Sequence, residues 1–119
     1  MACAFMEHIK NDAYYLKKLR ADMVFIVKHM AGVDAAGFQS NEVLQDSMMF
    51  RLIQISENAE KISEKYKTKH SGLPWKELRG LRNRIVHDYG HVDLTIIYET
   101  VKNDIPKVCR ILEMLDKMQ

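Results

Sequence analysis

The residues from Arg82 to Tyr89 bring together more reactive side chains than any other stretch of this 119-residue chain. They read Arg-Asn-Arg-Ile-Val-His-Asp-Tyr. A guanidinium group can hold a phosphate through parallel hydrogen bonds, an imidazole can move a proton near neutral pH, and a phenol offers a hydroxyl group. The segment therefore contains the groups needed to bind a phosphate ester and act on it.

These side chains suit the cleavage of RNA by its neighbouring 2′-hydroxyl group. Arg82 can stabilise the negative charge that grows on the phosphoryl oxygens, and His87 can remove and return a proton. Asn83 can hydrogen-bond the substrate or orient His87, while Tyr89 can donate a hydrogen bond or stack on a base. The reaction leaves a cyclic phosphate and needs no metal ion.

Arg82 and His87 cannot face one substrate atom from a regular helix. Five residues at about 100° each place the two side chains about 140° apart. His87 and Tyr89 share a face only where the chain is extended. We therefore expect the motif to span a helix end and the turn after it, with Gly90 as the stop. Alternatively, a second protomer completes the pocket, because a symmetric dimer brings two copies of each group into one cleft.

A structural role competes with this interpretation. Arg84 and Asp88 are four residues apart and can form a salt bridge on a helix surface. A single histidine beside aromatic residues is also more often structural than catalytic. The other four histidines are His8, His29, His70 and His91, and none of them has a comparable setting. Only His91, which lies next to the motif, is kept as a second candidate.

Basic residues gather between Lys61 and Arg84. This segment holds eight Lys and Arg and two Glu, so it carries +6, whereas the whole chain carries +2. Such a patch attracts a polyanion. A solvated helix face explains the lysines at 61–69 alone. Lys76, Arg79 and Arg84 adjoin the reactive segment and are predicted to bind RNA.

Apolar residues at helical spacing predict four helices that carry these groups. The predicted helices span about 5–30, 42–69, 74–85 and 94–115. In the short third helix, four residues are expected to point inward: Trp75, Leu78, Leu81 and Ile85. With 5 Gly, 2 Pro and 47% hydrophobic residues, the composition favours an all-α, up-and-down helical bundle. The length suits a single domain over residues 1–119.

Residues that begin or interrupt helices mark the boundaries. Residues 31–40 are predicted to form a loop, with Gly32 and Gly37 as helix breakers. Ser40 or Asn41 is expected to cap the second helix, Pro74 to begin the third, and Asp93 to cap the fourth. Pro106 is expected to kink or divide the fourth helix.

The composition also bears on location and cofactors. No apolar run resembles a signal peptide or approaches the length of a membrane span. Cys3 and Cys109 are expected to be reduced thiols in a cytoplasmic protein, although a disulfide is possible. The sequence contains no CxxC, HExxH or dense His/Cys cluster, so it predicts neither a metal site nor a cofactor.

Several segments resemble one family of small helical ribonucleases. Arg82-x4-His87-x-Tyr89, with Asn83 after the first arginine, is similar to the signature of the HEPN superfamily. The resemblance to its HepT branch, the DUF86 family, covers about residues 42–115 and rests on residues 52–60 (LIQISENAE), 73–75 (LPW), 78–89 (LRGLRNRIVHDY), 92–94 (VDL) and 103–106 (NDIP). One departure is Ser56, where many relatives have Gly, and it puts nothing catalytic in doubt.

The resemblance implies a HEPN-like homodimer of four- to five-helix protomers, with the active cleft between them. It further implies the toxin of a toxin–antitoxin pair, a metal-independent endoribonuclease whose partner is MntA, a minimal nucleotidyltransferase. Arg82 and His87 match the catalytic pair, and Asn83 matches the polar position beside it. Tyr89 matches the tyrosine to which the antitoxin adds AMP. The added bulk and negative charge would then exclude RNA.

Two other functions remain open at this point. In the first, the chain is a non-catalytic module that holds nucleotide or RNA for a nucleotidyltransferase, and Tyr89 only binds. In the second, it is a helical dimerisation protein whose motif forms structural salt bridges. The intact set of Arg82, His87 and Tyr89 argues against the second, whereas only an activity measurement separates the first from a ribonuclease.

Overall fold

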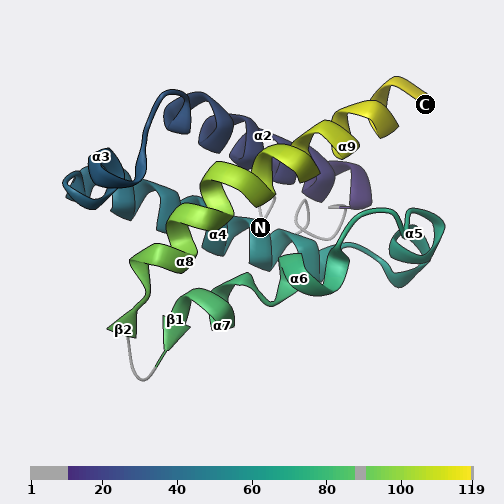
Figure 1. Ribbon diagram of the computed structural model, residues 1–119. Helices are drawn as coiled ribbons and strands as arrows, with labels where there is room; N and C mark the ends of the chain where they lie inside the picture. The colour runs from purple at the N-terminus through teal and green to yellow at the C-terminus, as the bar shows by residue number, and fades with distance from the viewer. Residues whose placement is uncertain (1–10, 88–90, 119) are drawn as a thin grey trace, which may run out of the picture.

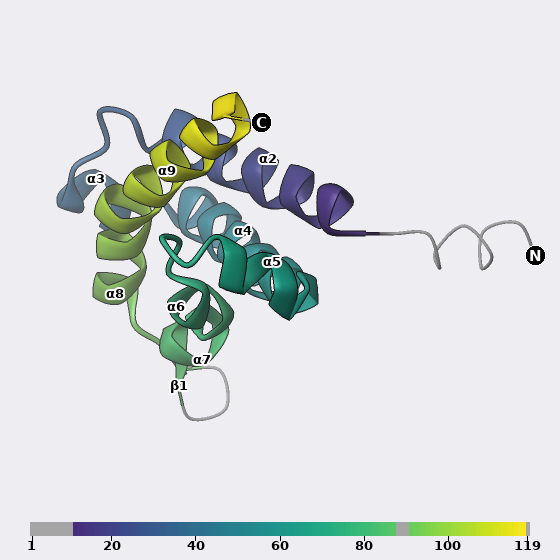
Figure 2. The same cartoon turned by 90° about the vertical axis from the view of Figure 1, so that its right-hand side faces the viewer.

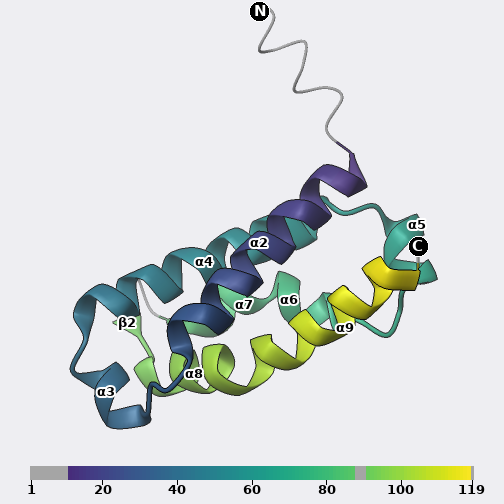
Figure 3. The ribbon, with the colours of Figure 1, turned by 90° about the horizontal axis from the view of Figure 1, so that it is seen from above.

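The computed structural model describes residues 11–87 and 91–118, including the backbone but not the side chain of His87 (Figure 1). The three longest helices in these ranges are α2 (Asp12–Met30), α4 (Glu42–Lys61) and α9 (Ile105–Met118). Helix α2 packs against both α4 and α9 (Figure 3). The predicted all-α bundle is thus confirmed. None of the described helices is both long and apolar enough to cross a membrane.

Helix α2 begins later than the spacing predicted. Asn11 has an extended backbone (φ −132°, ψ −175°), and its side chain accepts a hydrogen bond from the Tyr14 amide. A continuous helix over 5–30 is therefore wrong, and residues 5–10 lie outside the described ranges. The predicted buried face is confirmed over its second half by four residues that are at most 2% exposed: Leu19, Met23, Ile26 and Met30.

The predicted loop at 31–40 contains the short helix α3 (Ala35–Gln39). Gly32 does end the preceding helix, with the positive φ of 74° that favours glycine. Gly37 is not a breaker, because its amide donates a 2.7 Å hydrogen bond to the capping side chain of Asp34. Phe38 anchors α3 by burying its ring in the core.

The second predicted helix is two helices, α4 and α5 (Glu64–Lys69). Asn41 caps α4, as one of the two expected residues. The break follows Ile62, because Ser63 caps α5 and is itself held from the start of α2. The Asp12 carboxylate accepts hydrogen bonds from the Ser63 amide at 2.9 Å and hydroxyl at 2.6 Å. This contact fixes the end of α4 against α2.

The third predicted helix is likewise two short helices, α6 (Trp75–Arg79) and α7 (Leu81–Ile85), joined at Gly80. The inward positions of Trp75, Leu78, Leu81 and Ile85 are confirmed, since all four are at most 7% exposed. Pro74 lies just before α6 as its capping residue, one position earlier than predicted. Both helices lie along α4, and β1 follows α7 (Figure 2).

Two short strands, which the sequence did not predict, follow α7. Strand β1 (Val86–His87) pairs antiparallel with β2 (His91–Val92), and Val86 lies opposite Val92. Asp93 then caps α8 (Leu94–Glu99) through the amides of Thr95 and Ile96, as predicted.

The fourth predicted helix is interrupted near Pro106, as expected. A π-helical turn, η1 (Thr100–Asp104), joins α8 to α9 just before the proline. Proline has no amide hydrogen for a helical bond, so a local widening of the helix accommodates it. The apolar face remains continuous through five buried residues: Ile97, Val101, Ile105, Val108 and Leu112. Cys109 is also buried and is a free thiol, whereas Cys3 lies outside the described residues.

Candidate active site

The reactive segment leaves its helix between Arg82 and His87, as the geometry predicted. Helix α7 ends at Ile85, and Val86 has an extended backbone (φ −102°, ψ 114°). His87 therefore lies on a strand rather than on the helix that carries Arg82. Asp88, Tyr89 and Gly90 lie outside the described residues, so the expected stop at Gly90 and the Arg84–Asp88 salt bridge stay predictions.

Burial of two residues determines how α7 presents its polar side chains. Leu81 and Ile85, four residues apart, are 3% and 0% exposed. They hold the inner face of the helix against α4 and α8. Because these positions face inward, the three intervening residues are turned to the surface and are exposed: Arg82, Asn83 and Arg84.

Arg82 and Asn83 line an open cavity of about 300 Å³ between α4 and the α6–α7 segment. We call this cavity the Arg82 pocket. Three basic side chains and two acidic ones line it, so its net charge is +1. Its remaining lining residues are Ser56, Glu57, Glu60, Lys61 and Arg79.

The two arginines of the Arg82 pocket differ in their partners. The Arg79 guanidinium lies 4.0 Å from the Glu60 carboxylate and 3.8 Å from that of Glu64. No acidic side chain in the described ranges pairs with Arg82. Among the residues that the structure describes, Arg82 thus has fewer carboxylate partners than Arg79 to compete with a phosphate.

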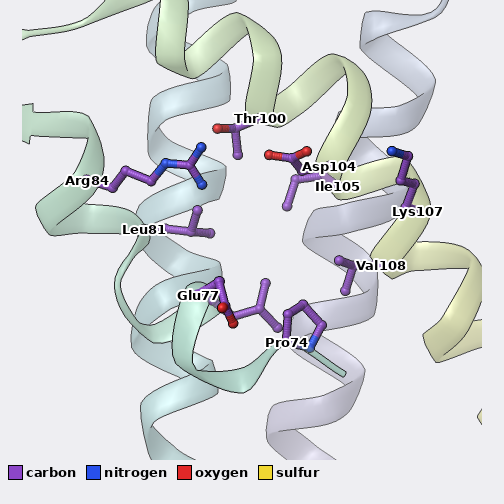
Figure 4. A pocket seen from close by; sticks show the side chains of 10 residues that line it. Pro74, Glu77, Leu81, Arg84, Thr100, Asp104, Ile105, Lys107 and Val108 are labelled. Atoms are coloured by element: carbon purple, nitrogen blue, oxygen red, sulfur yellow. The ribbon is translucent and has the colours of Figure 1, made fainter. Parts of the chain in front are cut away.

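The predicted RNA-binding residues do not form one cluster. Arg79 joins Arg82, and Lys76 is exposed on α6. Arg84 instead lines a second cavity of about 330 Å³ between α6–α7 and η1–α9. Figure 4 shows the Arg84 side chain extending toward this cavity, with Asp104 across from it. An RNA strand bound at Arg82 would reach Arg84 only around α7.

The predicted solvated lysine face is correct except at one position. Lys61, Lys65 and Lys69 are exposed, but Lys67 is 6% exposed. Its ammonium group lies 3.7 Å from the Glu64 carboxylate, which compensates part of the cost of burying its charge.

The other histidines occupy different settings. His29 packs against Phe25 and His70 against Tyr66, with ring centroids 4.1 and 4.2 Å apart, which supports structural roles. His91 lies directly opposite His87 in the strand register and is exposed. The two candidate histidines are therefore cross-strand neighbours in the backbone pairing. His8 lies outside the described residues.

Three pocket residues on α4 were not identified from the sequence as part of the site. Ser56 follows the buried Ile55, Glu60 follows the buried Ala59, and Glu57 comes next to Ser56. The spacing of four residues between Ser56 and Glu60 indicated that these two residues share one face of the helix. It could not indicate that α6 and α7 pack along that face.

The chain belongs to the Ribonuclease HepT-like family, whose model matches residues 19–115. The matched region includes α4, α6 and α7, which together form the Arg82 pocket. The predicted relationship to the HepT branch is therefore confirmed.

Similar proteins from three organisms support the same assignment. A protein of Caldanaerobacter subterraneus subsp. tengcongensis, named "Putative RNase TTE0752", is 29% identical over 92% of this chain and 98% of its own length. A Thermococcus cleftensis protein, "Probable ribonuclease HepT", is 27% identical over 87% of this chain and 94% of its own. The Methanocaldococcus jannaschii protein "Gamma-glutamylcyclotransferase and putative RNase MJ0434" is 30% identical over 91% of this chain, which spans 50% of it. No solved structure matches the chain significantly.

Proposed function

We propose that this protein is a metal-independent endoribonuclease that cleaves RNA at the Arg82 pocket. One observation carries the proposal: Arg82 and Asn83 line the same open pocket, and the helix that carries both residues ends just before His87. Membership of the Ribonuclease HepT-like family and the names of the relatives support the same reaction.

The reaction follows from the chemistry of these side chains. His87 takes the proton of the RNA 2′-hydroxyl, and the 2′-oxygen attacks the adjacent phosphorus. Arg82 stabilises the charge on the phosphoryl oxygens as the bond to the 5′-oxygen breaks. The imidazolium returns the proton to the leaving 5′-oxygen, and a 2′,3′-cyclic phosphate remains. Asn83 orients the phosphate or the imidazole.

We further propose that the active cleft lies between two protomers. Helix α4, which lines the Arg82 pocket, also exposes apolar side chains. Phe50 is 57% exposed and Val43 is 81% exposed, seven residues apart on one side of the helix. Apolar side chains at this spacing suit a helix–helix contact. A second copy packed on α4 would bring two Arg82 pockets near one another.

Regulation by a nucleotidyltransferase antitoxin completes the proposal. Tyr89, two residues after His87, is the proposed acceptor of AMP. The added phosphate would bring negative charge and bulk next to the catalytic histidine, where an RNA phosphate must bind. Modified toxin would then bind RNA poorly, without any change in its fold.

The test is cleavage of mixed RNA in EDTA by the wild type and by His87→Ala, with the intact mass of each protein measured first. Cleavage by the unmodified wild type alone supports a metal-independent ribonuclease centred on His87. If unmodified wild type binds RNA but leaves it intact, the chain is a binding module. An inactive protein that carries an AMP-sized mass increase on Tyr89 must be assayed again after the AMP is removed.

A further inference from the structure

We propose that Ser56 is a positioning residue, which holds the joint between α6 and α7 and thereby aims Arg82 and Asn83 into the pocket. The Ser56 hydroxyl donates a 2.7 Å hydrogen bond to the Arg79 carbonyl across the α4–α6 contact. Ser56 is 6% exposed, so this bond is largely shielded from water. The inference rests on the proposed role of Arg82 in RNA cleavage.

The bond falls where the backbone most needs a partner. Arg79 is the last residue of α6, and the last carbonyls of a helix lack donors within it. Gly80 links the two helices: its amide donates to the Lys76 carbonyl, and its carbonyl accepts from the Arg84 amide, both at 3.0 Å. Ser56 thus satisfies the carbonyl next to the one residue that joins α6 to α7.

The Arg79 side chain provides a second, weaker attachment. Its guanidinium faces Glu60 of α4 and Glu64 of α5 at 3.8–4.0 Å. Ion pairs this exposed contribute little, because water and salt screen them. The Ser56 hydrogen bond is therefore the specific contact that fixes the Arg79 backbone. The ion pairs of the Arg79 side chain depend on where that backbone lies.

A shift at this joint moves the start of α7, the helix that carries the proposed catalytic groups Arg82 and Asn83. Arg82 and Asn83 come three and four residues after Arg79 and line the same pocket as Ser56. Helix α7 has only five residues and few hydrogen bonds of its own. Small displacements of a charge-stabilising group slow a reaction strongly. Ser56 is thus expected to affect turnover more than RNA binding.

The test compares three variants of the full chain: Ser56→Ala, Ser56→Thr and Asn58→Ala. Ser56→Thr keeps a hydroxyl donor. Asn58→Ala is the matched control, because Asn58 is equally buried on α4 and donates to the Gln54 carbonyl of the same helix, away from the joint. Amide hydrogen exchange by NMR and cleavage of a single-stranded RNA oligonucleotide are measured for each, after thermal melting confirms folding.

We expect Ser56→Ala to speed exchange of the Arg84 amide. The variant should also lower kcat roughly fivefold, while KM stays within about twofold of the wild type. A roughly fivefold decrease in kcat corresponds to the loss of about one hydrogen bond in the transition state. Ser56→Thr should restore both, and Asn58→Ala should change neither. Wild-type kcat and Arg84 exchange in Ser56→Ala would overturn the inference while leaving the ribonuclease intact. A wild type that does not cleave RNA would overturn both the proposed reaction and the role of Ser56 in it, even if exchange shows that the joint is held.

Discussion

Arg82 and Arg84 lie two residues apart on α7, yet their side chains line different cavities. Arg82 faces the pocket formed with α4, and Arg84 faces the cavity beside η1 and α9. Two helical residues at this separation point about 200° apart, so both cannot contact one phosphate. The three arginines that looked equivalent in the basic segment thus have distinct settings, with Arg79 paired to carboxylates.

This difference predicts that the same substitution, arginine to lysine, affects RNA cleavage strongly at one position and weakly at the other. Arg82→Lys should lower kcat/KM for RNA roughly 100-fold, because lysine keeps the charge but loses the planar pair of donors. Arg84→Lys should stay within about threefold of the wild type, since its effect is limited to long-range attraction. Cleavage kinetics at one fixed salt concentration check both, and comparable losses for the two variants would mean that RNA also passes through the Arg84 cavity.

The exposed apolar face of α4 predicts that turnover depends on dimerisation. Phe50→Arg places a charge where the second protomer is proposed to pack, so we expect folded monomers and little cleavage. The melting temperature should fall only by the stabilisation that dimerisation supplied. Val24→Arg is the control, because Val24 is 43% exposed on α2, away from the pocket. Light scattering and RNA cleavage are measured on the same samples. A monomeric Phe50→Arg protein with full activity would show that each protomer holds a complete site.

Removal of the Tyr89 hydroxyl separates catalysis from regulation. Tyr89→Phe should still cleave RNA within about tenfold of wild type, because the ring and its stacking are retained. It should escape silencing by the nucleotidyltransferase antitoxin with ATP, since phenylalanine offers no oxygen for AMP. Intact mass spectrometry before and after incubation checks this outcome. If the variant gains AMP to the same extent as wild type, the acceptor is another residue.

Local spacing in the sequence predicted the buried faces of the helices well, because a side chain's direction depends on its few neighbours. Leu81 and Ile85 are buried as predicted, and the chain leaves the helix between Arg82 and His87 for the geometric reason given. These are consequences of helical period, which acts over one or two turns. The direction of the exposed residues of α7 follows from the same argument.

The sequence predictions were wrong where a residue far away in the sequence decides the local structure. The spacing of Ile62 and Tyr66 continues the helical period, yet α4 ends there because Asp12, 51 positions away from Ser63, binds the Ser63 amide and hydroxyl. The Ser56–Arg79 bond likewise spans 23 positions. No pattern within a single helix contains such pairings, so the α4–α5 break and the lining of the Arg82 pocket needed the structure.

The buried thiol of Cys109 is expected to resist alkylation. Burial raises its pKa, and the nearby Glu113 carboxylate, 3.8 Å from the sulfur, adds to the increase, while Arg20 and Arg110 oppose it. Because only the thiolate reacts, the folded protein with Cys3→Ser should react with iodoacetamide more slowly than a free thiol at mildly alkaline pH. Glu113→Gln should speed the reaction, as one of the causes of the raised pKa is removed.

The same shift predicts how stability changes with pH. The folded protein holds the Cys109 proton more tightly than the unfolded chain, so the contribution to stability is complete below the unfolded thiol pKa, about 8.5. It should decline as pH rises through the folded pKa. Cys109→Ala should flatten this alkaline decline in the free energy of unfolding, measured by urea titration at several pH values. An equally steep decline in Cys109→Ala would assign it to other groups, such as the tyrosines and lysines.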